Sequence, residues 1–172
     1  MPKKLPKSLK PEEFKELINH TIKVTARKKQ EDKRMKVAFL LAYGAGMRIS
    51  EVVSLKKENI TKDRIDIWNA KGGKDRVVPL PKGWREWMLQ FIPIGLDVRS
   101  LQRKFRIYAD RAGLSPAYTF HSLRHGFATR LVEGGVPINH IQTLMGHSDI
   151  STTGIYLKAR PEDALKSYGE LF

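Results

Sequence analysis

The stretch from residue 121 to residue 156 reads HSLRHGFATRLVEGGVPINHIQTLMGHSDISTTGIY and decides the fold of this part of the chain. Glycines that stop helices and a proline that starts one divide it, which predicts helices at 121–133 and 137–145. The Ser-Asp pair of MGHSD then predicts the cap of a third helix, which carries Tyr156. Three short helices joined by tight glycine turns are expected here.

The same stretch gathers side chains that suit a phosphate group. His121 and Arg124 are three residues apart, so on a helix they share one face. Arginine offers a planar fork to phosphate oxygens, and histidine carries a proton near neutral pH. His147 follows a helix stop, and Tyr156 adds a hydroxyl further on. Each of these side chains alone is more often structural, so a functional interpretation rests on their combination.

The composition favours a polyanionic partner. The 172 residues include 32 Lys and Arg against 18 Asp and Glu, and the net charge of +14 suits nucleic acid. The alternative is a soluble surface that is merely rich in lysine. The chain has no cysteine, which excludes disulfides and thiolate nucleophiles. Its longest apolar run, Val37–Met47, is too short to span a bilayer. We therefore expect one cytoplasmic domain, with no membrane contact and no small-molecule substrate.

The remaining sequence predicts an α+β fold that is mainly α-helical, with one small antiparallel sheet. The hydrophobic period changes between about residues 59 and 81, where RIDIWNA alternates, KGGK forms a turn and DRVVPLP provides a second strand. This pattern predicts a β-hairpin with a lysine-rich tip. Apolar periodicity and capping residues predict further helices at about 11–29, 33–44, 50–60, 82–91, 98–112 and 161–172.

A second segment, YGAGMRISEVVSL, adds another arginine to the candidate site. Arg48 lies between a glycine break and a helix start, where backbone N–H groups also favour an anion. With Arg124 it supplies two guanidinium groups, which can neutralise both non-bridging oxygens of a phosphodiester. Lys71, at the hairpin tip, is a candidate to protonate the leaving 5′ oxygen, and Lys74 competes with it for that role.

On these motifs the chain resembles the catalytic domain of the tyrosine recombinases, the integrase and Xer family of site-specific DNA strand-exchange enzymes. GMRISEVVSL resembles the first-arginine segment of the family, and NAKGGKDRVVPLP resembles its lysine hairpin. HSLRH, LMGHSD and DISTTGIY resemble its remaining boxes. The resemblance implies the catalytic residues Arg48, Lys71, His121, Arg124, His147 and the nucleophile Tyr156, with Glu51 in support and with Lys74 and Arg76 as supporting residues or contacts to the DNA backbone.

The resemblance also implies the reaction. Tyr156 attacks the scissile phosphate and forms a 3′-phosphotyrosyl link, while the 5′ hydroxyl leaves with a proton from Lys71. A 5′ hydroxyl from a partner duplex then reverses the step and completes strand exchange. No metal or other cofactor takes part, because two arginines supply the positive charge. The implied partners are double-stranded DNA and further copies of the chain, assembled on DNA as a dimer or tetramer.

Three parts are expected along the chain: a basic flexible arm at 1–8, a catalytic domain at 9–160 and a C-terminal helix at 161–172. In the family, the segment after the tyrosine commonly docks on a neighbouring protomer. The helix here has an apolar face that suits docking in trans or packing in cis, formed by Ala164, Leu165, Tyr168, Leu171 and Phe172. Integrase-type members also carry an N-terminal core-binding domain. The arm is too short for one, so weak affinity and weak site choice are expected.

Three other functions compete with this interpretation. A type IB topoisomerase uses similar residues and relaxes DNA without strand exchange. A DNA-binding module without catalysis is a second alternative. A metal hydrolase is the third, since His121 and His125 are four residues apart and His147 offers another ligand. However, Ser122 stands where an HExxH motif requires glutamate, and the adjacent arginine would place positive charge beside the metal.

Overall fold

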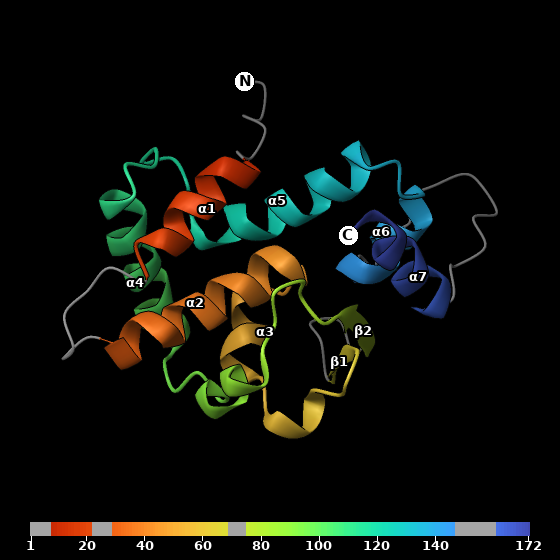
Figure 1. Cartoon of the computed structure of the whole chain (residues 1–172), viewed down its shortest axis with the longest axis horizontal. Coiled ribbons are helices and arrows are strands. Elements are labelled where there is room, and N and C mark those ends of the chain that lie inside the picture. The colour runs from red at the N-terminus through yellow and green to blue at the C-terminus, as the bar shows by residue number, and fades with distance from the viewer. Residues whose placement is uncertain (1–7, 22–28, 69–74, 147–160) are drawn as a thin grey trace.

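The computed structural model describes residues 8–21, 29–68, 75–146 and 161–172, and Figure 1 shows how their elements are arranged. These residues form a group of packed helices with one small antiparallel pair of strands at its side, which confirms the predicted mainly helical α+β class. The elements are α1 (Pro11–Asn19), α2 (Lys29–Gly44), α3 (Ile49–Ser54), the 3₁₀ helix η2 (Lys57–Asn59), β1 (Arg64–Ile67), β2 (Arg76–Pro79), the 3₁₀ helix η3 (Glu86–Phe91), α4 (Val98–Arg111), α5 (Phe120–Glu133), α6 (Ile138–Met145) and α7 (Pro161–Leu171).

Helices α2 and α5 form the centre of the molecule. Figure 1 shows α5 running across the fold, from α1 and α4 at one end to α6 at the other. Its apolar residues recur at helical spacing on one side, and Leu123, Phe127 and Leu131 are fully buried there. In the larger apolar cluster, Phe39 of α2 packs edge to face on Phe105 of α4. The segment HSLRHGFATRLVE, residues 121–133, therefore lies on the main helix of the core.

The β-hairpin follows the alternation of its sequence. Strands β1 and β2 are antiparallel, with Ile65 opposite Val78 and Ile67 opposite Arg76. Ile65 and Val78 are completely buried, because alternate side chains of a strand point to the same face. The predicted tip with Lys71 and Lys74 falls at 69–74, which lies outside the described residues.

Glycines end several helices where the sequence predicted it. Gly113 follows α4 with a φ of +67°, and Gly146 caps α6 in the left-handed conformation with a φ of +59°. Helix α2 ends at Gly44, and Gly46 two residues later has a φ of +68°. L-residues with a β-carbon avoid this region, so these glycines set sharp turns. The predicted helix with Tyr156 lies outside the described residues.

Several element boundaries differ from the sequence prediction. The helix expected at 50–60 ends at Ser54, because Leu55 adopts an extended conformation and turns its side chain into the core. The helix expected at 82–91 is only the 3₁₀ helix η3, since Gly83 with a φ of +91° makes a turn before it. Helix α1 ends at Asn19, ten residues before the predicted end. Periodicity locates helices better than it locates their ends.

Helix α7 packs on its own chain in this structure. Ala164 and Tyr168 are buried in a second apolar cluster with Phe127 and Leu131 of α5 and Leu144 of α6. Figure 1 shows α7 beside α6 at one end of the molecule. Docking of this helix on a neighbouring protomer stays a prediction. No helix in the described part of the chain is long and apolar enough to cross a membrane.

Candidate active site

The turn between α2 and α3 places Arg48 at the start of α3. A β-carbon on Gly46 would lie 2.5 Å from the ring of Phe127, so only glycine allows α5 to approach the turn this closely. Arg48 follows as the N-cap of α3, and its backbone N–H donates to Glu51 Oε2 at 2.6 Å. The glutamate three residues after the cap is the partner that a capping box requires. The helix start thereby fixes Arg48 and Glu51 together.

Glu51 is the centre of an arginine cluster. Arg76 of β2 donates to both carboxylate oxygens, at 2.5 and 2.7 Å, and Arg48 Nη1 donates to Oε1 at 3.0 Å. Burial by itself raises the pKa of Glu51, but the hydrogen bonds and charge of Arg76 and the bonds from Arg48 outweigh it, so the pKa is lowered. The carboxylate is therefore ionised at neutral pH and orients two guanidinium groups.

Arg124 comes to the same cluster from α5. It is 2 % exposed, and its Nη1 donates to the carbonyl oxygen of Gly46 at 2.6 Å and lies 4.0 Å from Glu51 Oε2. Its Nη2 donates to the carbonyl oxygen of Met145. Burial lowers the pKa of Arg124 to about 9, and the positive charges of Arg48 and Arg76 add to the effect. The guanidinium is still protonated at neutral pH.

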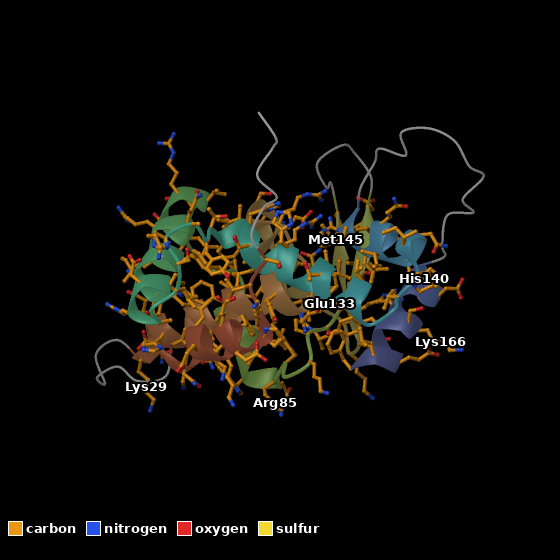
Figure 2. The ribbon with its side chains drawn as sticks, turned by 90° about the horizontal axis from the view of Figure 1, so that it is seen from above. Lys29, Arg85, Glu133, His140, Met145 and Lys166 are labelled. Atoms are coloured by element: carbon orange, nitrogen blue, oxygen red, sulfur yellow. The ribbon has the colours of Figure 1, made fainter. Side chains whose placement is uncertain are left out.

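The three arginines hold the C-terminal end of α6 by its backbone. The carbonyl oxygens of Leu144, Met145 and Gly146 accept from Arg76 Nε at 3.0 Å, from Arg124 Nη2 and from Arg48 Nη2 at 3.1 Å, respectively. The last carbonyls of a helix have no partner within the helix and carry its negative partial charge, so cations suit them. Met145 marks this end of α6 in Figure 2. His147 is the next residue after the held segment.

The cluster carries excess positive charge. Three guanidinium groups face one carboxylate, so the group has a net positive charge in a largely buried setting. Among the three arginines only Arg48 reaches solvent appreciably, with 23 % of its side chain exposed. A positive site with limited access to water attracts anions strongly, because the effective dielectric constant is low. The arrangement can bind a phosphate group and stabilise negative charge that develops on it.

His121 lies at the first turn of α5 with an exposed side chain. Its ring contacts the ring of His125 edge to face, with centroids 4.4 Å apart. The pKa of His125 is lowered by burial and by the charge of Arg124. Within the described residues, no group of three or more His, Cys, Asp or Glu side chains is arranged to hold a metal ion.

The structure brings together four of the residues predicted from the sequence: Arg48, Glu51, Arg76 and Arg124. His121 lies on the same helix as Arg124. The remaining predicted site residues, Lys71, Lys74, His147 and Tyr156, lie outside the described residues.

Arg76, for which the resemblance implies a supporting or DNA-contacting role, is buried beside Glu51. Its side chain is buried, and its guanidinium is bonded to Glu51 and to α6, so it is not free to bind a phosphate at the surface. A signal for this was present in the sequence. In RVV the arginine occupies the same face as the buried Val78, and the alternation of a strand turns both inward.

Comparison with known proteins gives the same site a family context. The model of the phage integrase family matches residues 7–163, which is most of the chain. The chain belongs to the phage integrase family. Among curated members of the family, tyrosine recombinase XerA of Thermococcus onnurineus is 38 % identical over 97 % of this chain. Tyrosine recombinase XerC of Proteus mirabilis is 30 % identical over 88 % of this chain.

Solved structures of family members have the same fold. The integrase from mycobacterium phage Brujita superposes with a TM-score of 0.74, at 24 % identity over all of this chain and 60 % of that chain. A XerA recombinase crystal structure superposes with a TM-score of 0.69 at 25 % identity, over 98 % of this chain and 66 % of that chain. The chain spans 63 % of the length of its Thermococcus XerA relative and 54 % of that of the Proteus XerC relative.

Proposed function

We propose that this chain is the catalytic domain of a site-specific DNA recombinase, which cleaves and rejoins strands through a 3′-phosphotyrosyl intermediate. The observation that carries the proposal is the arginine cluster. Arg48 and Arg124 come from segments that are far apart in the sequence, yet both reach the carboxylate of Glu51 and the end of α6. Such an arrangement suits a phosphodiester whose transition state gathers negative charge on its non-bridging oxygens.

In this proposal Tyr156 is the nucleophile: its oxygen attacks the scissile phosphate in line, and the hydroxyl proton is released to water. The P–O bond to the 5′ oxygen breaks, and Lys71 supplies the proton that this oxygen needs as it leaves. Arg48 and Arg124 bind the non-bridging oxygens, and His147 and His121 assist by donating hydrogen bonds. The phosphotyrosyl bond is then attacked by a 5′ hydroxyl of a second duplex, which releases the tyrosine and joins the strands.

The proposed partners are double-stranded DNA and further copies of the chain. The net charge of +14 supports the first. For the second, solved structures with a similar fold include a lambda integrase dimer on a core site and a lambda integrase tetramer on a Holliday junction. Because its substrate is DNA, we also propose that the protein acts in the cytoplasm. Lys74 remains a proposed DNA contact on the hairpin.

Covalent capture tests the proposed function. A pool of nicked duplexes with random sequence is incubated with the chain, and adducts that survive denaturation are sequenced and digested for mass mapping. We expect the DNA-linked peptide to contain Tyr156, and Tyr156→Phe to bind DNA without forming an adduct. An adduct formed by that variant would refute the assignment of the nucleophile.

The same captured duplex separates recombination from topoisomerase activity. A supercoiled plasmid with two copies of the captured site should yield recombined products, whereas a plasmid without the site should stay supercoiled. Relaxation of both plasmids without recombinant products would favour the type IB topoisomerase alternative. Cleavage that is unchanged in EDTA would exclude the metal hydrolase.

A further inference from the structure

Arg76 is buried in the site rather than exposed on the hairpin. It is the first residue of β2 and lies opposite Ile67 of β1. Only 9 % of the residue is exposed. A guanidinium on a two-stranded hairpin ordinarily points to solvent, since burying it costs several kcal/mol unless every donor is bonded. Its burial therefore indicates a specific role inside the molecule.

The first part of that role concerns Glu51. Arg76 binds the carboxylate as a two-pronged fork, with one nitrogen on each oxygen. The same carboxylate lies 3.0 Å from Arg48 Nη1 and 4.0 Å from Arg124 Nη1. If the fork of Arg76 were absent, the negative charge of Glu51 would be balanced only by those two arginines. Arg48, which already donates to the carboxylate, and Arg124 would then bind it more closely and would offer fewer N–H groups to a phosphate.

The second part concerns the end of α6. Arg76 Nε donates to the carbonyl oxygen of Leu144 at 3.0 Å, and the stem of the side chain lies against Gly146. A β-carbon on Gly146 would come within 2.7 Å of Arg76 Cδ, so the glycine is needed for this close approach as well as for its left-handed φ. Arg76 thus joins the hairpin, the base of α3 and the end of α6 in one contact.

We propose that Arg76 is a positioning residue of the cleavage reaction. It takes both oxygens of Glu51, keeps Arg48 and Arg124 available for the phosphate, and fixes the end of α6 from which the chain continues to His147. It does not touch the DNA itself. This inference rests on the proposed function, because its effect is measured on strand cleavage.

Four variants of the full chain test the proposal on the nicked duplex captured by the wild type. They are Arg76→Met, Arg76→Lys, Glu51→Gln and the double variant Glu51→Gln/Arg76→Met. The single-turnover rate of adduct formation is measured at saturating protein, and the dissociation constant for DNA is measured separately by fluorescence anisotropy. Arg130→Met serves as a matched control, because Arg130 also holds a backbone carbonyl, that of Tyr43, with a partly buried guanidinium.

We expect Arg76→Met to slow maximal cleavage about 100-fold, as a small displacement of catalytic groups does. Its dissociation constant for DNA should stay within about twofold of the wild-type value, since a buried residue makes no phosphate contact. The maximal cleavage rate of Arg76→Lys should lie between those of the wild type and Arg76→Met, because lysine keeps the charge but cannot bind both carboxylate oxygens as a fork. The double variant should cleave at least about tenfold faster than Arg76→Met, because the carboxylate that binds the remaining arginines is gone.

Two results would overturn the proposal. A weaker affinity for DNA with an unchanged maximal rate would make Arg76 a DNA contact. If the fold-loss in cleavage rate of the double variant equals the product of the fold-losses of the two single variants, Arg76 does not act through Glu51. If Arg76→Met fails to fold, two other variants test the proposal, because neither Arg76→Lys nor the double variant has a buried unpaired carboxylate. Their maximal cleavage rates are then compared with the rate of Glu51→Gln. A wild-type chain that forms no adduct would count against the proposed function instead.

Discussion

Glu51→Ala should lower the free energy of unfolding far more than an ordinary surface substitution does. The carboxylate accepts two hydrogen bonds from Arg76, one from the side chain of Arg48 and one from the backbone N–H of Arg48. It is 7 % exposed, so it is largely shielded from water. Without it, three neighbouring guanidinium groups would repel one another with no counter-charge. Removing one partner of a buried ion pair costs about 3–5 kcal/mol.

The expected loss is therefore about 4 kcal/mol in the free energy of unfolding, or roughly 8–16 °C in Tm for a chain of this length. Urea denaturation followed by circular dichroism measures the first quantity, and a thermal scan measures the second. Glu170→Ala is the control, because Glu170 lies 4.0 Å from Lys166 in an exposed pair. That change should stay within about 0.5 kcal/mol of the wild type.

The pH dependence gives a sharper test of the same reasoning. The folded-state pKa of Glu51 is lowered from the usual 4.5, so the stability that its ionised form contributes is present above pH 4.5 and lost as the pH falls through the folded-state value. The gap between the wild type and Glu51→Ala should be constant near neutral pH and should narrow under acid conditions. A gap below about 1 kcal/mol at neutral pH, or one unchanged in acid, would refute the account.

Two further substitutions test the contacts that support the site. Gly46→Ala should lower the free energy of unfolding by about 3 kcal/mol, because the new β-carbon meets the ring of Phe127 and the φ is positive. Gly135→Ala is the control: its φ is also positive but the space around it is open, so it measures the backbone contribution alone, about 1 kcal/mol. Equal losses in urea denaturation would rule out the steric contribution. Tyr168→Phe should cost about 1 kcal/mol, since its hydroxyl donates to the carbonyl oxygen of Gly44. An unchanged midpoint would show that this hydrogen bond adds nothing to the packing of α7.

The sequence predicted the parts of this site that depend on local pattern. Helix α5 carries Arg124 where the HxxR spacing and the glycine stop place it, and Arg48 stands between a glycine break and a helix start, as expected. Gly113 and Gly146 end their helices as predicted. All of these depend on residues within one or two turns of each other, where backbone preferences decide the outcome.

The parts that could not be predicted depend on contacts between distant segments. Nothing local to Arg76 shows that its partner is Glu51, 25 residues earlier. Likewise, the carbonyl oxygens at the end of α6 carry no sequence signal, yet they accept from three arginines. The 3₁₀ helix η3 was predicted as a longer α-helix because its apolar period is the same over one turn. Tertiary packing decides such cases, and it overrides local preference.

Burying Arg124 beside two other guanidinium groups has a consequence for phosphate binding. Burial and the positive charges of Arg48 and Arg76 together lower the pKa of Arg124 to about 9. The guanidinium is therefore protonated at neutral pH, but its protonated form is less stable here than it is in water. An anion that enters the cluster relieves this repulsion. The relief is greater for a pentavalent phosphorane than for a diester, because the transition state carries more negative charge on its non-bridging oxygens. The single carboxylate of Glu51 thus neutralises only part of the positive charge of the cluster. The remaining positive charge binds the transition state more strongly than the substrate, because the transition state carries more negative charge.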